Sequence, residues 1–101
     1  MPILQDPEEN EIRAFLKHTG RLEGKSVLEI GCGDGRLTWR YAGDAAHVTG
    51  IDPDTERYQR ALADFPAHLN GKVALHNIGL DDFASQAHTD QYDLALLSWS
   101  L

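Results

Sequence analysis

Hydrophobic and polar positions follow two kinds of spacing along this chain of 101 residues. Short apolar runs, such as VLEI and YDLALLS, have the length and composition of buried strands. Between them, apolar residues recur at helical spacing, and one stripe predicts a buried helix face made of Tyr58, Ala61, Leu62 and Phe65. The pattern predicts strands over 27–30, 48–51, 72–76 and 92–98, and helices over 6–20, 35–42, 53–65 and 81–88.

Strands and helices alternate in this order, which favours a parallel sheet with right-handed crossovers. We therefore expect one doubly wound α/β domain over residues 1–101. The last predicted strand is the most hydrophobic, and three residues follow it. We expect the sheet to be truncated after this fourth strand, in a fragment of a longer protein. The alternative is a short chain that covers the edge of the fourth strand by self-association.

Composition narrows the class of protein. The chain is 42% hydrophobic and 25% charged, as in ordinary soluble domains. Its net charge is −7 with scattered Lys and Arg, which argues against a nucleic-acid footprint in this segment. The one cysteine, Cys32, excludes an internal disulfide and fits a reducing compartment. With no signal peptide or membrane-spanning run, we interpret the protein as cytoplasmic without a membrane partner. The five histidines have no metal-ligand spacing, so no metal site is predicted.

A glycine-rich turn follows the first predicted strand in VLEIGCGDGRLT, residues 27–38, with glycine at every second position. Glycine reaches positive φ cheaply and lets the backbone approach a ligand without interference from Cβ. In open α/β sheets, ligands sit beyond the carboxyl ends of the strands, where the next strand ends at Asp52. Its carboxylate can accept both hydroxyls of a ribose, at about 1.5–3 kcal/mol for each charge-assisted hydrogen bond.

Two residues of the turn distinguish between adenosine cofactors. In the dinucleotide fingerprint G-x-G-x-x-G, the third glycine would stand at position 36, which is Arg36 here. Glu29 stands two residues before the first glycine, where a carboxylate suits a ligand with an ammonium and a sulfonium better than a diphosphate. The turn therefore favours a sulfonium cofactor.

Three segments resemble the class I S-adenosylmethionine (SAM)-dependent methyltransferases, in the order of that family. Residues 29–35 (EIGCGDG) look like its motif I, 48–53 (VTGIDP) like its second motif, and 92–98 (YDLALLS) like its fourth-strand segment. The resemblance covers nearly the whole chain and implies a Rossmann-like fold with S-adenosyl-L-methionine as cofactor. It implies an enzyme that transfers the sulfonium methyl of SAM to an unidentified acceptor, of which this chain is the amino-terminal, cofactor-binding part.

The resemblance also implies a set of site residues. The methionine part of SAM would be lined by Gly31, Cys32, Gly33 and Gly35, with Glu29 shaping that pocket. Asp52 would bind the ribose hydroxyls, and Pro53 would pack near the adenine. No general base is predicted, because the sulfonium is already activated.

Two further parts of the implied site depart from a simple motif. Gly79 stands near the position where the family often has an acid for the adenine amino group. We therefore expect backbone groups of Ile78, Gly79 and Leu80 to make that contact. Ser98, at the end of the fourth strand, would lie near the transferred methyl without a role in proton transfer.

Several residues keep a second interpretation. Cys32 is a space-filling side chain or a nucleophile, and Glu29 shapes the pocket or caps the turn. His76 is a strand-edge residue or a ligand contact, and Asp81 and Asp82 are a solvated helix start or a ligand pair.

Two other functions also remain open for the whole chain: a non-catalytic or degenerate SAM-binding module, and an NAD-dependent oxidoreductase. Residues 20–26 (GRLEGKS) look like a phosphate-binding P-loop. They have three residues between the glycines instead of four and precede a strand, so we predict no phosphate site there.

Overall fold

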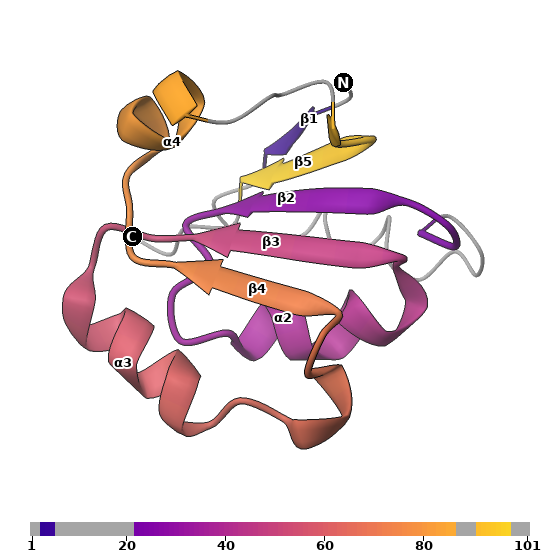
Figure 1. Ribbon diagram of the computed structural model, residues 1–101, viewed down its shortest axis with the longest axis horizontal. Coiled ribbons are helices and arrows are strands. Elements are labelled where there is room, and N and C mark those ends of the chain that lie inside the picture. Colours follow the sequence, from indigo (N-terminus) through magenta and orange to yellow (C-terminus); the bar gives the residue numbers. More distant parts are fainter. Residues whose placement is uncertain (1–2, 6–21, 87–90, 98–101) are drawn as a thin grey trace.

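The computed structural model describes residues 3–5, 22–86 and 91–97, and Figure 1 shows its arrangement of strands and helices. The strands are β1 (Ile3–Gln5), β2 (Ser26–Ile30), β3 (His47–Ile51), β4 (Val73–His76) and β5 (Leu94–Leu97). The helices are α2 (Arg36–Tyr41), α3 (Thr55–Ala63) and α4 (Leu80–Gln86), with 3-10 turns over Ala42–Asp44 and Ala67–Leu69. The predicted helix over 6–20 lies outside the described residues.

These strands form one parallel sheet in the order β1-β5-β2-β3-β4. The chain moves outward from β2 to β3 and β4, and then returns to the other side of β2 as β5. This topology confirms the predicted doubly wound α/β fold. Figure 1 shows α2 and α3 on one side of the sheet, and α4 away from them near the strand ends.

Two apolar cores cover the two faces of the sheet, because successive strand residues point to opposite faces. The larger core joins α2 to one face and includes Val27, Val48, Val73, Leu94 and Leu96 with Leu37 and Tyr41. The smaller core joins α4 to the other face through Leu28, Ile51, Ala95 and Phe83. The glycine turn and α2 therefore lie on the face of the larger core.

One strand was not predicted from the sequence, and it corrects the expectation of an exposed edge. Ile3–Gln5 forms β1, which pairs with β5 in parallel register from Ile3↔Ala95 to Gln5↔Leu97. The fourth predicted strand, β5, is therefore paired on both sides, and the sheet does not end there. The proposed self-association through that edge was wrong as stated, because the chain's own β1 occupies it.

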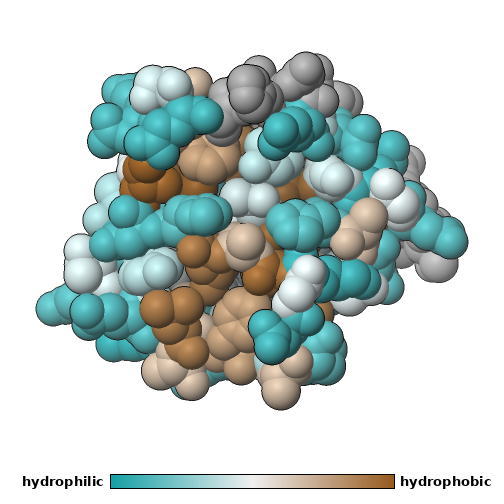
Figure 2. Space-filling model, viewed as in Figure 1, coloured by the Kyte–Doolittle hydropathy of each residue, from teal (hydrophilic) through white to brown (hydrophobic). Residues whose placement is uncertain are grey.

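Helix α3 differs from its prediction in two details. It begins at Thr55 after Asp54, whose side chain accepts a hydrogen bond from the Arg57 amide, so Pro53 precedes the cap. Ala61 is buried, but Leu62 is 48% exposed, against the predicted buried stripe. Helix α3 packs beside β4, the last strand of the sheet, so part of its apolar face has no strand to cover. Figure 2 shows apolar residues reaching the surface between hydrophilic ones.

Candidate functional site

The strand register aligns the residues from which the site is built. Ile30 lies opposite Ile51, and Ile51 lies opposite His76, so three strands end at the same edge of the sheet. The ladder continues one step further, since the Gly31 amide donates to the Ile51 carbonyl (2.8 Å) and the Asp52 amide donates to the His76 carbonyl (3.1 Å). The residues that follow the three strands therefore stand in one row beyond their carboxyl ends.

The glycine turn needs glycine for two separate reasons. Gly31, Gly33 and Gly35 all have positive φ, between 59° and 88°. At Gly35, which precedes α2, an added Cβ would also lie 2.3 Å from the indole ring of Trp39. Trp39 itself packs edge-on against Phe65, with ring centroids 5.2 Å apart. Backbone conformation explains all three glycines, and close packing against Trp39 is a second reason at Gly35.

Asp52 points directly at this turn. Its Oδ2 accepts a hydrogen bond from the Gly33 amide at 2.8 Å, and its Oδ1 accepts one from the Asp54 amide at 2.8 Å. The residue is 6% exposed. A carboxylate has about four acceptor positions, so two bonds leave capacity for ligand hydroxyls. The predicted convergence of the turn and the acid is confirmed as geometry.

Two residues that position Asp52 were not singled out from the sequence. The Asn77 side-chain amide donates to the Asp52 carbonyl (3.0 Å) and accepts from the Thr55 hydroxyl (3.2 Å), which joins the exits of β3 and β4. Asp54 caps α3 while its amide holds Asp52. The sequence shows that Asn77 and Asp54 both follow predicted strands. It does not show the strand register that brings them together, because register depends on tertiary structure.

Glu29 is fully buried on the α2 side of the sheet. Its Oε1 accepts hydrogen bonds from the Thr38 hydroxyl (2.7 Å) and the Tyr41 hydroxyl (2.5 Å), so it ties β2 to α2 across the glycine turn. Burial, with the negative charge of Glu29 beside it, raises the pKa of Tyr41. The Glu29 carboxylate therefore fixes α2 against β2, the two elements that the glycine turn connects. Its role in shaping a cofactor pocket stays a prediction.

Cys32 has the surroundings of a packing residue. It is buried, and an added Cβ at Gly50 would lie 3.1 Å from its Sγ, so its side chain fills the space above Gly50. Burial, followed by the charges of Glu29 and Asp52, raises the pKa of Cys32 from 9.0 to about 12. Such a thiol stays protonated at neutral pH, which favours the space-filling interpretation over the nucleophile.

The exit of β4 brings together the residues predicted near the adenine. A Cβ placed on Gly79 would lie 3.9 Å from the Cβ of Pro53, so these two residues face each other. Leu80, at the start of α4, is 44% exposed and Ile78 is partly buried. Asp81 and Asp82 are exposed in the first turn of α4, as a solvated helix start. Ser98 lies outside the described residues.

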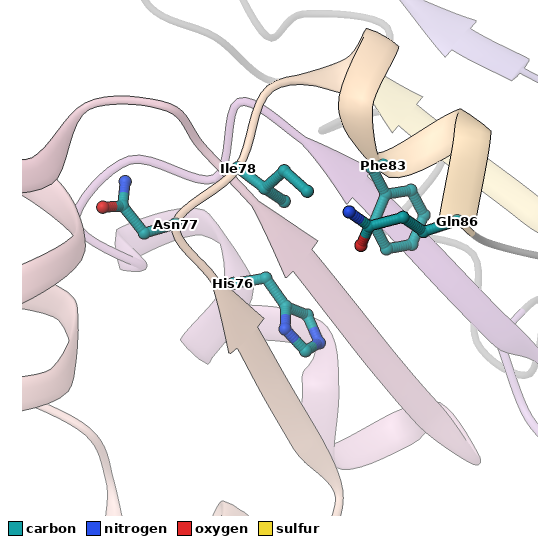
Figure 3. Close-up of a pocket in the computed structure, with 5 residues that line it drawn as sticks. All are labelled: His76, Asn77, Ile78, Phe83 and Gln86. Atoms are coloured by element: carbon teal, nitrogen blue, oxygen red, sulfur yellow. The ribbon is translucent and has the colours of Figure 1, made fainter.

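A pocket of about 420 Å³ opens beside this exit, on the α4 side of the sheet. It is lined by His76, Asn77, Ile78, Phe83 and Gln86, and Figure 3 shows the amide end of the Asn77 side chain extending toward α3. Two apolar side chains, an imidazole and an amide suit a planar ligand with polar edges. His76 is therefore well placed, and its contact with a ligand stays a prediction.

The described ranges hold neither a metal-ligand cluster nor a membrane-spanning helix. They contain no group of three or more His, Cys, Asp or Glu residues that could hold a metal ion. None of the helices described is long and apolar enough to cross a membrane.

A doubly wound parallel sheet, with a glycine turn and an acid at adjacent strand ends, defines an α/β domain built for a nucleotide-like cofactor. The profile of the methyltransferase-domain family matches residues 28–101. The chain therefore belongs to the methyltransferase-domain family.

Two curated relatives are named for different reactions, one as an O-methyltransferase and the other as a carboxymethyltransferase. The chain is 37% identical over 83 residues to the ubiquinone biosynthesis O-methyltransferase of Aromatoleum aromaticum, covering 79% of this chain and 33% of that protein. It is 42% identical over 63 residues to the tRNA U34 carboxymethyltransferase of Shewanella sediminis, covering 54% of this chain and 19% of that protein. The chain thus spans no more than 33% of either relative.

A solved structure supports the same assignment. The crystal structure of the S-adenosylmethionine-dependent methyltransferase from Mesorhizobium loti matches with a TM-score of 0.63 and 27% sequence identity. The match covers 89% of this chain and 38% of that one.

Proposed function

We propose that this chain is the cofactor-binding part of a longer SAM-dependent methyltransferase. The observation that carries the proposal is the 2.8 Å hydrogen bond from the Gly33 amide to Asp52, which brings the turn and the acid to one place. An adenosyl group bound beside this pair would set its ribose hydroxyls on Asp52 and its adenine near Pro53 and Gly79. The 33% span of the ubiquinone-pathway relative supports the assignment to part of a longer enzyme.

Charge around the turn supports SAM over a dinucleotide. The carboxylates of Glu29, Asp52 and Asp34 all contribute to the raised pKa of Cys32, in the middle of the turn. That environment repels a diphosphate and attracts a sulfonium and an ammonium. In the proposed reaction the acceptor atom bonds to the methyl carbon as the carbon–sulfur bond breaks, and the electron pair stays on sulfur as S-adenosylhomocysteine forms. Holding the acceptor atom in line with the methyl carbon can lower the activation barrier by about 7–11 kcal/mol.

The two relatives are named for ubiquinone biosynthesis and for tRNA U34, so one cofactor domain is compatible with different acceptors. A cytoplasmic location belongs to the proposal and is supported by the one cysteine, a buried free thiol.

Calorimetry tests the proposal with the chain itself. S-adenosylhomocysteine should bind and release or absorb heat, whereas NADH should give no signal. Asp52→Ala should weaken binding tenfold or more, because two charge-assisted hydrogen bonds are lost. Asp64→Ala, at the far end of α3, is the matched acidic control and should leave affinity unchanged. Binding of NADH instead would overturn the assignment.

A degenerate SAM-binding module is the alternative function. A turnover assay distinguishes it from an active methyltransferase. A degenerate protein would bind S-adenosylhomocysteine tightly but would not consume methyl-labelled SAM with any acceptor.

A further inference from the structure

The outer edge of β4 presents backbone groups that no described strand uses. β4 is the last strand in the order of the sheet, so its outer side has no strand partner among the described residues. The carbonyls of Lys72 and His76 accept hydrogen bonds from amides of β3 and its exit, at 3.0 and 3.1 Å. Backbone groups in a strand alternate in direction, so those of Val73 and Leu75 point outward, where another strand can pair with them.

Apolar surface lies next to this edge. Leu62 on α3 is 48% exposed, and α3 packs beside β4. Figure 2 shows apolar residues gathered on the surface over α3 and β4. Val73 and Leu75 contribute to the core on the α3 side of the sheet. A further strand beyond β4 would therefore pair with the outward backbone groups and also cover the exposed part of the apolar face of α3.

The sequence of β4 fits an antiparallel copy of itself. Residues opposite each other in an antiparallel pair share a face of the sheet, and outward backbone groups must meet outward ones. Both conditions hold when Ala74 lies opposite Ala74 of a second copy, because each Val73 is then opposite a Leu75. The strands come closest at this central pair, about 4.5 Å between Cα atoms, where alanine is small enough. The next register, centred on Leu75, would place each Val73 opposite the polar Asn77.

Charge at the two ends of β4 favours the same orientation. Lys72 directly precedes the strand, and its ammonium donates to the Gly43 carbonyl (2.9 Å), a neutral acceptor that leaves its charge in place. Asp81 and Asp82 follow the strand and are exposed in the first turn of α4. Antiparallel pairing sets the cationic start of each strand beside the acidic exit of the other, whereas parallel pairing would set like ends together.

We propose that the outer edge of β4 is a self-association surface, on which a second copy of this chain pairs its own β4 in antiparallel orientation about a two-fold axis at Ala74. The two five-stranded sheets would then form one continuous sheet. The edge of β5 is occupied by β1, so association takes place at the opposite side of the sheet. This surface does not include Asp52 or the glycine turn, and association is therefore independent of cofactor binding.

Sedimentation equilibrium of the chain tests this association directly. The mass should rise with concentration from 11.2 kDa, the mass of one copy, to twice that value. Ala74→Lys places two like charges at the axis and should weaken the dimer by about tenfold or more. Leu62→Ser should weaken it by about threefold or more, through loss of apolar contact. Ala84→Lys, at an exposed position of α4, is the matched control and should leave the dimer unchanged.

Amide hydrogen exchange identifies the strand that pairs. The outward amides of Val73 and Leu75 should exchange more slowly as concentration rises, whereas the Ala74 amide, which faces β3, should not change. A chain that stays at 11.2 kDa through the millimolar range would overturn the inference and leave this edge for a strand of another protein. A dimer that Ala74→Lys does not weaken, or a mass beyond two copies, would also overturn it, because two-fold pairing of one edge is closed. Thermal melts of each variant confirm that folded chains are compared.

Discussion

Replacing Gly35 by alanine tests how closely the glycine turn is packed. Gly35 has a φ of 88°, and an added Cβ would lie 2.3 Å from Cζ2 and 2.5 Å from Cε2 of Trp39. The left-handed conformation costs an L residue about 1–2 kcal/mol. The indole ring is also held against Phe65, so relieving the clash costs about 1–3 kcal/mol more. We therefore expect Gly35→Ala to lower the free energy of unfolding by about 2–5 kcal/mol, a large part of a small domain's stability.

The chain contains a matched control for the backbone contribution alone. Gly71 has a φ of 85°, but no neighbouring atom lies within 4 Å of an added Cβ. Gly71→Ala should therefore cost only about 1–2 kcal/mol. Urea unfolding followed by circular dichroism gives both values. Adding Trp39→Ala to Gly35→Ala should recover part of the loss in a double-mutant cycle. Equal costs for the two glycine variants would refute the packing of Trp39 against the turn.

Three other predictions concern the core beside the turn. Because burial raises the pKa of Cys32 to about 12, its thiol should resist iodoacetamide at pH 8 in the folded chain and react on unfolding. Tyr41→Phe should lower the free energy of unfolding by about 1–3 kcal/mol at pH 7, through loss of the bond to Glu29. The raised pKa of Tyr41 also means that stability falls as pH rises above 10.0, where the unfolded tyrosine ionises first, and the variant should show less of this fall. Gly50→Ala should cost about 1–3 kcal/mol, because its Cβ would lie 2.9 Å from Leu75 Cδ2.

Controls for these variants come from the same chain. Gly43→Ala has open space at its Cβ and an ordinary φ, so it should change stability by less than about 0.5 kcal/mol. Rapid labelling of the native Cys32 thiol would contradict its burial. An unchanged alkaline unfolding curve for Tyr41→Phe would show that another group controls stability above pH 10.0.

The sequence predicted the elements whose signals are local. The four apolar runs became β2 to β5, and alternation with helices was enough to predict a parallel, doubly wound sheet. Strand β1 was missed because three residues are too few to display a period of two. The exposure of Leu62 was missed because helical spacing shows which residues share a face, and not whether the sheet extends far enough to cover it.

The contacts of the candidate site also fall into those that the sequence predicts and those that it does not. Gly33 and Asp52 could be paired from sequence, because both follow strands and parallel strands end at one edge. Trp39 and Arg57 could not, since their contacts with Gly35 and Gly33 depend on how α2 and α3 pack against the turn. When a side chain on a neighbouring helix packs against a loop, no periodic pattern in the sequence marks that contact.

The structure of this chain with S-adenosylhomocysteine bound is the most direct measurement. It should show both ribose hydroxyls within hydrogen-bonding distance of the Asp52 carboxylate, with the amino-acid half lying along Gly31 to Gly35. An adenosyl group bound away from Asp52 and the glycine turn would contradict the account.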